Sequence, residues 1–567
     1  YQNNTEPLHW TREKGTGGLG AVAERPGNPG GIRRFRQTVH APDLRVPDWA
    51  ADIVYYYVFP ERFRNGNRAN DPQPGRDRYR NTQVEKHARW TDRPYRPGSG
   101  DGSDAVFNND FFGGDLEGLA DKLDDIRELG ANTIYMTPVF RAASNHKYDH
   151  ADYLNVDPAF GGNAAWERLL REATRRGIRV IPDASLNHTG SDSIYFDRYG
   201  HFGGTGAFSG GRPNPTSPYF GWYKFDLTQK ESDRQYRGWV GVPDLPELDK
   251  ASPAWRDFAY RKPDSVTRTW LKRGAAGWRM DVAPWVPDDF WREWRQAVKS
   301  TKPDALTVAE TWFDSSKYFL GDMFDSTMNY IFRNAVQDYA GGGKASGLVA
   351  QLEHLREAYP APVHRALMNL LSSHDQARAL HVFGWHDDPK DRAANAQAQA
   401  QAQARARQRL LLGVFLQMSY PGAPTVYYGD EVGVTGGDDP YNRATWPWPD
   451  EGGKPDLALR AQFRRLIAMR HANPVLRRGE LMAPVVVDEH VVVWPRRLAA
   501  GGQERWALVA VNNAAAARTV RLPRPAGMPR GPLSDALAEA LGSAAVAGDG
   551  EVIEFEVPAL FGRVLLR

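Results

Sequence analysis

Two short apolar runs that each end in a carboxylate carry the strongest chemical signal in the sequence. Gly277–Val282 reads GWRMDV and contains Asp281, and Val308–Trp312 reads VAETW and contains Glu310. The segment between them, WVPDDFWREWRQAV, has the apolar spacing of one amphipathic helix. Such a strand–helix–strand step places both acids at the same end of neighbouring parallel strands. A pair of carboxylates in one pocket is the minimum set for cleaving a glycosidic bond, and the alternative is two acids in unrelated salt bridges.

Composition places the chain among large globular proteins and excludes several functions. Of 567 residues, 41% are hydrophobic and 25% are charged, and the formal net charge is +3. No basic stripe suggests a nucleic-acid partner, and no apolar run has the length of a membrane span. The absence of cysteine excludes disulfides, thiolate catalysis and cysteine-ligated metals. The chain begins at Tyr1 rather than Met, so we expect a removed leader and an extracellular or periplasmic (secreted) protein.

An alternation of strand and helix patterns predicts a parallel sheet. Apolar spacing predicts a helix over residues 115–129, which Asp115 caps and Gly130 ends. The repeat AQAQAQAQARARQ and the apolar residues after it predict one long helix, because Ala, Gln and Arg are good helix formers. Further strands are expected at Ile53–Phe59, Thr133–Thr137, Arg179–Ile181, Met323–Phe324, Ala366–Leu371 and Thr425–Tyr428, and further helices at Trp166–Arg176 and Ala254–Leu271. The rhythm indicates a (β/α)8 barrel, in which chemistry takes place at the carboxyl ends of the strands.

The predicted fold class is α/β, a (β/α)8 TIM barrel with an inserted subdomain after strand three and a C-terminal antiparallel β-sandwich. Residues 1–47 are rich in Gly, Pro and Arg without a sustained period, and we expect an N-terminal arm. The catalytic barrel is assigned to 48–478. Within it, the Gly-, Pro- and Tyr-rich stretch 188–249 interrupts the alternation as an inserted subdomain. Short alternating strands over 479–567 predict the sandwich.

Four strand-end motifs occur in order along the chain. They are DASLNH at Asp183–His188, GWRMD at Gly277–Asp281, AETW at Ala309–Trp312 and LLSSHD at Leu370–Asp375. Together they resemble the signatures of the α-amylase family (family 13) of retaining glycosidases, over residues 47–479. The phrases YYYVFPERFRNG, FFGGDLEGL, TPVFRAASNHKYDHADY, FDSTMNY and YYGDEVGVTGGDDP resemble the neopullulanase, cyclomaltodextrinase and maltogenic amylase branch. LPELD resembles that branch's MPKLN motif but ends in Asp249.

The resemblance implies a role for each matching residue. Asp281 is the expected nucleophile, Glu310 the general acid and base, and Asp375 the third catalytic acid, which binds sugar hydroxyls. Arg279 lies two residues before Asp281 on the same strand face and would keep it ionised. Asp183 and Asn187 are expected to orient Arg279. The remaining substrate-binding residues are expected to be Tyr148, His188, His374, Trp285 and Arg443, although strand-end histidines often only cap loops and Arg443 has a surface salt bridge as its alternative.

The resemblance also implies a structural calcium ion. Oxygen ligands at short spacing suit such a hard cation. The branch usually has Asp at the position of Asn67, so the site carries less charge, and a metal-free Asn-rich turn is the alternative. A second calcium site of ordinary α-amylases needs a His where this chain has Trp285, and we do not expect it. The expected calcium ligands are Asn65, Asn67, Asn70, Asp71, Gly113 and Asp115.

The resemblance predicts an α-glucan hydrolase acting on α-1,4 and, secondarily, α-1,6 bonds in maltooligosaccharides, cyclodextrins, pullulan or starch. A transglycosylase or sugar isomerase on the same site is the first alternative, and a non-catalytic glycan-binding or scaffold protein is the second. The branch usually carries a leading β-sandwich that builds its dimer. About 47 residues precede the barrel here, so we expect a monomer whose cleft is walled by 188–249, with Tyr219, Phe220, Trp222 or Tyr223 as sugar platforms.

Overall fold

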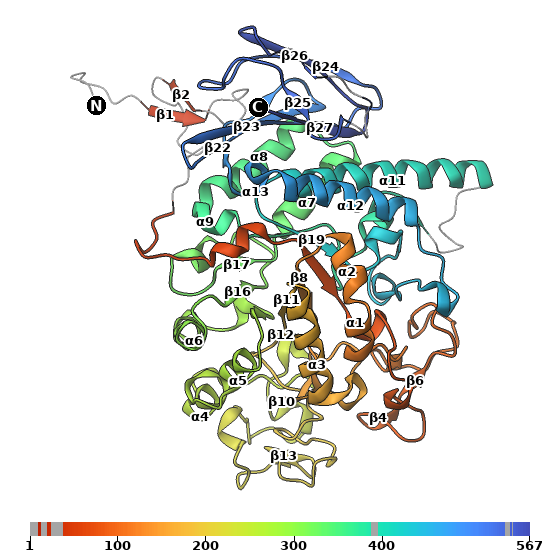
Figure 1. Ribbon diagram of the computed structural model, residues 1–567. Helices are drawn as coiled ribbons and strands as arrows, with labels where there is room; N and C mark the ends of the chain where they lie inside the picture. The colour runs from red at the N-terminus through yellow and green to blue at the C-terminus, as the bar shows by residue number, and fades with distance from the viewer. Residues whose placement is uncertain are drawn as a thin grey trace.

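Parallel strands form the centre of the molecule in the computed structural model (Figure 1). Two parallel sheets have the strand orders β11-β8-β3-β19-β18 and β12-β15-β16-β17. Strands β11 and β12 follow each other on one segment, and a parallel bridge from Met328 to Met368 links the segment of β17 to β18. The pairing therefore runs continuously around eight parallel segments, as in a (β/α)8 barrel. The structure describes residues 9–12, 20–23, 38–386, 395–538, 542, 545–546 and 548–567.

The strands of this ring are short and, apart from the exposed Arg179 on β11, buried, and two of them are followed directly by a carboxylate. Their register places Gly277 opposite Leu306 and Met280 opposite Ala309, so Asp281 and Glu310 follow neighbouring strands at the same end. The strands are β3 (Tyr55–Val58), β8 (Thr133–Met136), β11 (Arg179–Ile181), β12 (Asp183–Ala184), β15 (Gly277–Met280), β16 (Leu306–Ala309), β17 (Ser326–Thr327), β18 (Met368–Leu370) and β19 (Ala423–Tyr427).

Helices connect the strands and cover them with apolar faces. Six tryptophans are completely buried in the barrel region, among them Trp278 on β15 and Trp294 on α6. The helices are α1 (Leu116–Asp121), α2 (Leu123–Leu129), α3 (Gly162–Arg175), α4 (Pro253–Arg256), α5 (Val266–Lys272), α6 (Asp288–Thr301), α7 (Tyr330–Gly341), α8 (Ala345–Ala358), α9 (Ala361–His364), α10 (Ala379–Val382), α11 (Ala396–Ser419), α12 (Leu457–Ala472) and α13 (Pro474–Arg478). No described helix is long and apolar enough to cross a membrane.

Residues 188–249 lie at the end of the molecule opposite the C-terminal strands (Figure 1). They contain little regular structure, and antiparallel bridges from His188 to Glu247 and from Tyr223 to Leu248 close the segment on itself. Its core is aromatic, with Phe196 and Phe208 stacked at 5.3 Å between ring centroids. The other small strands are β1 (His9–Arg12), β2 (Gly20–Ala23), β4 (Arg78–Tyr79), β5 (Thr82–Gln83), β6 (Glu85–Lys86), β7 (Asp110–Phe111), β9 (Phe140–Ala142), β10 (His150–Val156), β13 (Phe208–Ser209) and β14 (Arg212–Pro213).

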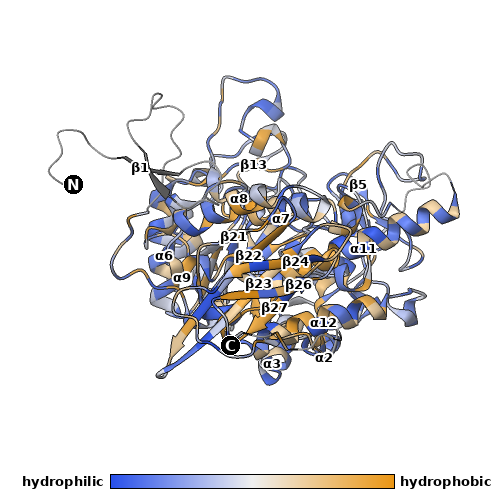
Figure 2. Ribbon diagram, turned by 90° about the horizontal axis from the view of Figure 1, so that it is seen from above, coloured by the Kyte–Doolittle hydropathy of each residue, from blue (hydrophilic) through white to orange (hydrophobic). Residues whose placement is uncertain are grey.

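The C-terminal strands are antiparallel and pack as two sheets. One has the order β20-β22-β23-β27-β25, with β21 also paired to β22, and the other contains β24 and β26. Apolar side chains of both sheets, including Trp506, Val520 and Phe555, form a separate core, and Figure 2 shows apolar residues along the middle of β22, β23 and β27. The strands are β20 (Glu480–Leu481), β21 (Val485–Val486), β22 (Val491–Ala500), β23 (Gln503–Asn512), β24 (Arg518–Pro523), β25 (Ser534–Asp535), β26 (Val552–Val557) and β27 (Phe561–Leu566).

Some expected boundaries were wrong for identifiable reasons. The helix expected over 115–129 is two helices that break at Lys122, although Asp115 caps the first and Gly130 ends the second with φ of 101°. The helix expected over Ala254–Leu271 is interrupted before Pro263, because proline cannot continue a helix. The strand expected at Met323–Phe324 lies three residues later. The long helix with the Ala-Gln repeat is confirmed as α11.

Candidate active site

Arg279 is the hub of the carboxylate cluster at the strand ends. It lies on β15 and is completely buried. Its Nη1 is 2.9 Å from Asp183 Oδ2 and 2.9 Å from Asp281 Oδ1, and its Nη2 is 3.1 Å from Glu310 Oε1. Three carboxylates from three strand ends therefore share one guanidinium, whose planar fork can hold several oxygens at once. Asp183 contacts Arg279 and also accepts hydrogen bonds from Tyr135 and Tyr148. The side chain of Asn187, also expected to orient Arg279, contacts His188 and Lys250 instead.

The backbone is strained directly after Asp281. Val282 has φ of 43° and ψ of 44°, in the left-handed region that a β-branched residue rarely adopts. Such a conformation costs about 1–3 kcal/mol and is held by surrounding contacts. Here the Val282 N–H donates to Glu310 Oε2 at 2.7 Å, so the strained turn ties the two strand-end acids together.

The environment of Asp281 disfavours its charged form. Burial and the nearby charge of Glu310 raise the pKa of Asp281 well above its usual range, while Arg279 opposes the shift. Both carboxylates contact the guanidinium of Arg279, and Glu310 also accepts the N–H of Val282, the residue after Asp281. A carboxyl group next to a second negative charge is less easily ionised, so Asp281 holds its proton to a higher pH than an exposed aspartate does.

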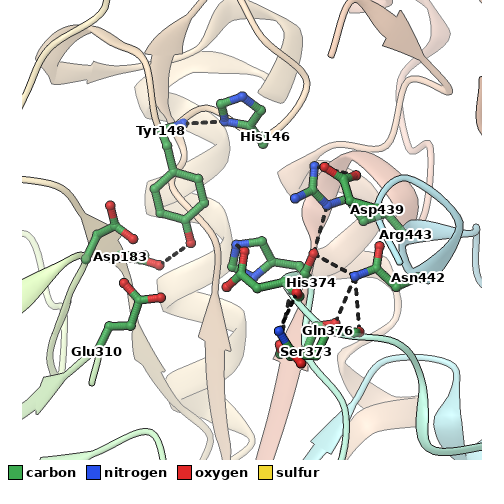
Figure 3. A network of polar contacts seen from close by, with 12 residues as sticks. His146, Tyr148, Asp183, Glu310, Ser373, His374, Gln376, Asp439, Asn442 and Arg443 are labelled. Carbon is green, nitrogen blue, oxygen red and sulfur yellow. Dashed lines mark hydrogen bonds and ion pairs between the residues drawn. The ribbon is translucent and has the colours of Figure 1, made fainter. Parts of the chain in front are cut away.

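Asp375 follows β18 and joins the same pocket. Burial raises its pKa to about 7, with a further contribution from Glu310 and opposition from Arg443. Its Oδ1 lies 3.2 Å from His374 Nε2, and the other ring nitrogen of His374 bonds the Tyr57 hydroxyl. His374 is neutral, because burial and nearby arginines lower its pKa far below the usual range. The ring of Tyr148 lies parallel to His374 at 5.3 Å, with its hydroxyl directed at Asp183 (Figure 3).

His188 has an unused ring nitrogen in this pocket. The residue is 1% exposed, and Nε2 has no hydrogen-bond partner among the described residues. Burial lowers the pKa of the ring to about 3, so it is neutral at ordinary pH. Its Nδ1 lies 3.2 Å from Asn187 Nδ2, and Trp239 stacks on the ring at 5.5 Å. A buried neutral imidazole with one free nitrogen is suited to bind a ligand hydroxyl.

Arg443 lies behind the pocket and is 7% exposed, and it forms the salt bridge considered as its alternative, with the partly exposed Asp439. It donates from Nε to the His374 carbonyl at 3.0 Å and pairs with Asp439 at 3.0 Å. The side-chain amide of Asn442 donates to the carbonyls of Ser373, His374 and Gln376. These two residues hold the loop that carries Asp375 (Figure 3). No motif or spacing in the sequence marks Asn442 as part of the site.

Exposed aromatic rings lie next to the acids. Trp285 is 43% exposed and meets Trp239 edge to face at 6.0 Å. Trp312, two residues after Glu310, is 40% exposed and stacks on Tyr330 at 3.9 Å. Neither Trp239 nor Trp312 was expected as a binding residue, although Trp312 is part of the strand-end motif AETW. Of the platforms it considered, Trp222 and Tyr223 are buried in the aromatic core and cannot stack on a sugar.

The loop expected to bind calcium presents buried oxygens without partners. Asn65 Oδ1 and Asn70 Oδ1 are buried and accept no hydrogen bond from the described residues. Burial raises the pKa of Asp115 to about 6, although its carboxylate accepts several N–H groups. Unpartnered oxygens beside two carboxylates fit a hard cation. The sequence did not predict that Lys86 on β6 would contact this loop. Its Nζ lies 2.9 Å from Asp71 Oδ2 and places a positive charge beside the expected cation ligands.

Two other expected calcium ligands of this loop have structural roles that need no cation. Asn67 Oδ1 accepts the Ala69 N–H and so caps a local turn. Gly113 has φ of 87°, and a Cβ there would lie 2.4 Å from Asp71 Oδ1, so only glycine lets the chain approach this carboxylate. Within the described residues, no group of three or more His, Cys, Asp or Glu side chains could hold a metal. A cation here would depend on amide and carbonyl oxygens.

Comparisons with known proteins agree with this geometry. A family model described as "Alpha amylase, catalytic domain" matches residues 57–446. An amylopullulanase from Thermoanaerobacter thermohydrosulfuricus is 38% identical over 514 residues, covering 85% of this chain and 33% of the relative. Neopullulanase 2 from Thermoactinomyces vulgaris is 34% identical over 470 residues, covering 82% of this chain and 70% of the relative. The chain spans between 25% and 37% of the length of the amylopullulanases that it matches.

Solved structures show the same likeness. The ligand-free cyclic alpha-maltosyl-(1→6)-maltose hydrolase from Arthrobacter globiformis has a TM-score of 0.70 and 31% identity, covering 92% of this chain and all of the other. The type III pullulan hydrolase from Thermococcus kodakarensis has a TM-score of 0.75 and 28% identity, covering 93% of this chain and 84% of the other.

Proposed function

Because the chain belongs to the α-amylase family, we propose that it is a retaining α-glucan hydrolase that cleaves α-1,4 and α-1,6 glucosidic bonds. The observation that carries this proposal is the placement of Asp281 and Glu310 on one guanidinium, that of Arg279, at 2.9 Å and 3.1 Å. A short separation of two carboxyl groups suits double displacement, in which one acid is the nucleophile and the other transfers protons.

The proposed reaction assigns one step to each group. Glu310 protonates the glycosidic oxygen while Asp281 attacks the anomeric carbon, forming a covalent glycosyl-enzyme. Water deprotonated by Glu310 then releases the sugar. This reaction requires a protonated Glu310 and an ionised Asp281 when substrate binds, and Arg279, in contact with Asp281, favours the charged form of the nucleophile.

The remaining groups would bind the sugar that occupies the pocket. Asp375 and the free Nε2 of His188 would bond its hydroxyls, and Tyr148 would contact the ring face. Arg443 and Asn442 would act through the Asp375 loop rather than on the sugar. Trp285 and Trp312 would provide aromatic faces for neighbouring sugars. A second candidate, transglycosylation, is favoured by the exposed Trp285, which packs against the partly buried Trp239, because an aromatic platform can hold a sugar acceptor in place of water.

The loop residues Asn65, Asn67, Asn70, Asp71, Gly113 and Asp115 are proposed to hold calcium as a structural ion. The unpartnered oxygens of Asn65 and Asn70 support this assignment, and Lys86 weakens it. When bound, the ion would link the loop after β3 to the start of α1. We also propose the division into an arm at 1–47, a barrel at 48–478 with the inserted subdomain 188–249, and a sandwich at 479–567.

The experiment that tests the function is a product analysis with pullulan, β-cyclodextrin, starch and isomaltose, followed by NMR of the newly formed anomer. We expect maltooligosaccharides, panose or maltotriose, released first as the α-anomer. Release of the β-anomer would contradict double displacement. Longer products at high sugar concentration would favour transglycosylation, and no turnover of any α-glucan would contradict the assignment.

A further inference from the structure

A second pocket lies at the other end of the barrel, next to the C-terminal strands. Its volume is about 540 Å³, and its lining includes Arg356, Arg365, Arg478, Arg497, His364 and Glu480. Arg365 precedes β18, whereas Asp375 follows that strand. The pocket therefore opens at the amino ends of the strands and is separate from the carboxylate cluster. Nothing in the proposed hydrolysis uses it.

The lining has an excess of positive charge. Four arginines face one glutamate, and His364 is neutral because burial and nearby arginines lower its pKa to about 3. The acids that pair with three of these arginines are not part of the lining. Arg478 bonds Asp48 at 2.9 Å and Asp52 at 2.6 Å, while Arg356 and Arg497 pair with Glu353 and Glu504.

Arg365 is the group in this pocket without a counter-charge. It is half-buried, and among the described residues its guanidinium has no hydrogen bond and no ion pair within 4 Å. Burial and the charge of Arg478 lower its pKa, and the more distant Asp48 opposes this only in part. A partly desolvated guanidinium next to like charges is unfavourable unless an anion accompanies it.

Two arginines behind the pocket add to the positive potential. Arg470 and Arg496 are completely buried and donate to main-chain carbonyls, including that of Gly479, which lines the pocket. Burial lowers the pKa of both to about 9, and Arg365 contributes to the shift of Arg496. Carbonyl dipoles satisfy the hydrogen bonds of these side chains but do not neutralise their charge.

We infer that this pocket binds a compact multivalent oxyanion of the phosphate class, with Arg365 as its principal contact. Planar guanidinium groups match the oxygens of phosphate in paired hydrogen bonds. Residues that line the pocket come both from the segments preceding β18 and β19 and from β20 and β22. A bound oxyanion would therefore join the barrel to the C-terminal sheet and stabilise the folded chain by mass action.

The test uses the wild-type protein with orthophosphate, pyrophosphate, sulfate and ADP, against NaCl at matched ionic strength. We expect pyrophosphate to raise the melting temperature more than NaCl does and to bind with a Kd that calorimetry can measure. Binding of ADP but not of pyrophosphate alone would overturn a free-oxyanion site. The same melting shift with NaCl would show that the effect is only charge screening, which also overturns the proposal.

Variants locate the site. Arg365→Gln should weaken pyrophosphate binding at least tenfold, and Arg365→Lys should weaken it less. Arg518→Gln, at an exposed position on β24, is the matched control and should leave binding unchanged. Arg497→Gln offers a second test if Arg365→Gln fails to fold, with an expected loss of about threefold. Unchanged binding in the folded Arg365 variants would contradict the proposal, and activity on α-glucans should not change in any of them.

Discussion

The two ends of the barrel collect opposite charges. At the carboxyl ends of the strands, Arg279 serves the three carboxylates Asp183, Asp281 and Glu310. At the amino ends, arginines outnumber acids around Arg365. Burial raises the pKa of the surplus carboxyls at one end and lowers the pKa of the surplus arginines at the other. Each end thus holds like charges together. The carboxylates are stabilised by protons and by the guanidinium of Arg279, and the arginines at the amino ends are stabilised by the proposed anion.

Substitution of the acids at the carboxyl ends of the strands should give the largest loss of activity. Asp281→Asn and Glu310→Gln should each lower kcat by about 10⁴-fold or more while leaving the melting temperature near that of the wild type, because each acid serves a separate step. Asp304→Asn, at an exposed position before β16, is the matched control and should retain full activity. Near-normal kcat in either active-site variant, measured on a substrate the wild type cleaves, would contradict the assignment.

Substitution of Arg279, which contacts three carboxylates, should lower both kcat and the free energy of unfolding. Arg279→Gln leaves three buried carboxylates without their cation, and we expect about 3–5 kcal/mol of lost stability together with at least a 10³-fold loss of kcat. Arg279→Lys keeps the positive charge but lacks the planar guanidinium that holds several oxygens. It should therefore be more stable than Arg279→Gln and lose about 100-fold in activity relative to the wild type. Urea unfolding measures the first effect. If Arg279→Gln were as stable as the wild type, the shared-guanidinium account would be wrong.

The pH dependence of stability gives a sharper test of the like-charge account. The folded pKa of Asp375 is about 7, above its usual value of about 4, so the folded state holds this proton more tightly than the unfolded chain does. The stability that this group contributes is complete below about pH 4 and is lost as the pH rises toward about 7. Asp375→Asn should therefore gain roughly 4 kcal/mol relative to the wild type at pH 8.

At pH 4 the same substitution should have little effect on stability, because Asp375 is then protonated in the folded wild type. Melting curves of both proteins from pH 4 to pH 8 measure the difference. A stability difference that does not depend on pH would show that Asp375 does not titrate in this range.

The smallest expected effect concerns the loop with Lys86. If the proposed calcium ion binds, a chelator should lower the melting temperature by roughly 2 °C and leave activity at low temperature unchanged, since the loop holds none of the proposed catalytic acids. Lys86→Met removes a competing positive charge from Asp71 and should tighten calcium binding several-fold. Arg68→Met, an exposed cation in the same loop, is the control. Identical melting curves with calcium and with chelator, for both variants and the wild type, would indicate a metal-free loop.

Local patterns were sufficient for many elements. Apolar spacing predicted α6, helix-forming residues predicted α11, and turn residues such as Gly130 marked helix ends, because these features depend on residues a few positions apart. Boundaries failed where a single residue changed the local geometry, as at Lys122 and before Pro263. The strand near Met323 was misplaced because two buried residues precede the paired ones, and burial alone does not reveal pairing.

The sequence by itself determined which residues meet at the strand ends. Asp183, Asp281, Glu310 and Asp375 each follow a strand pattern, and parallel pairing brings such positions together. Tertiary structure decided how these groups share charge. The contacts of Arg279 with three acids, the strained Val282, the free nitrogen of His188 and the unpaired Arg365 depend on the packing of segments tens to hundreds of residues apart. Burial and charge sharing are properties of that packing, so no local pattern in the sequence records them.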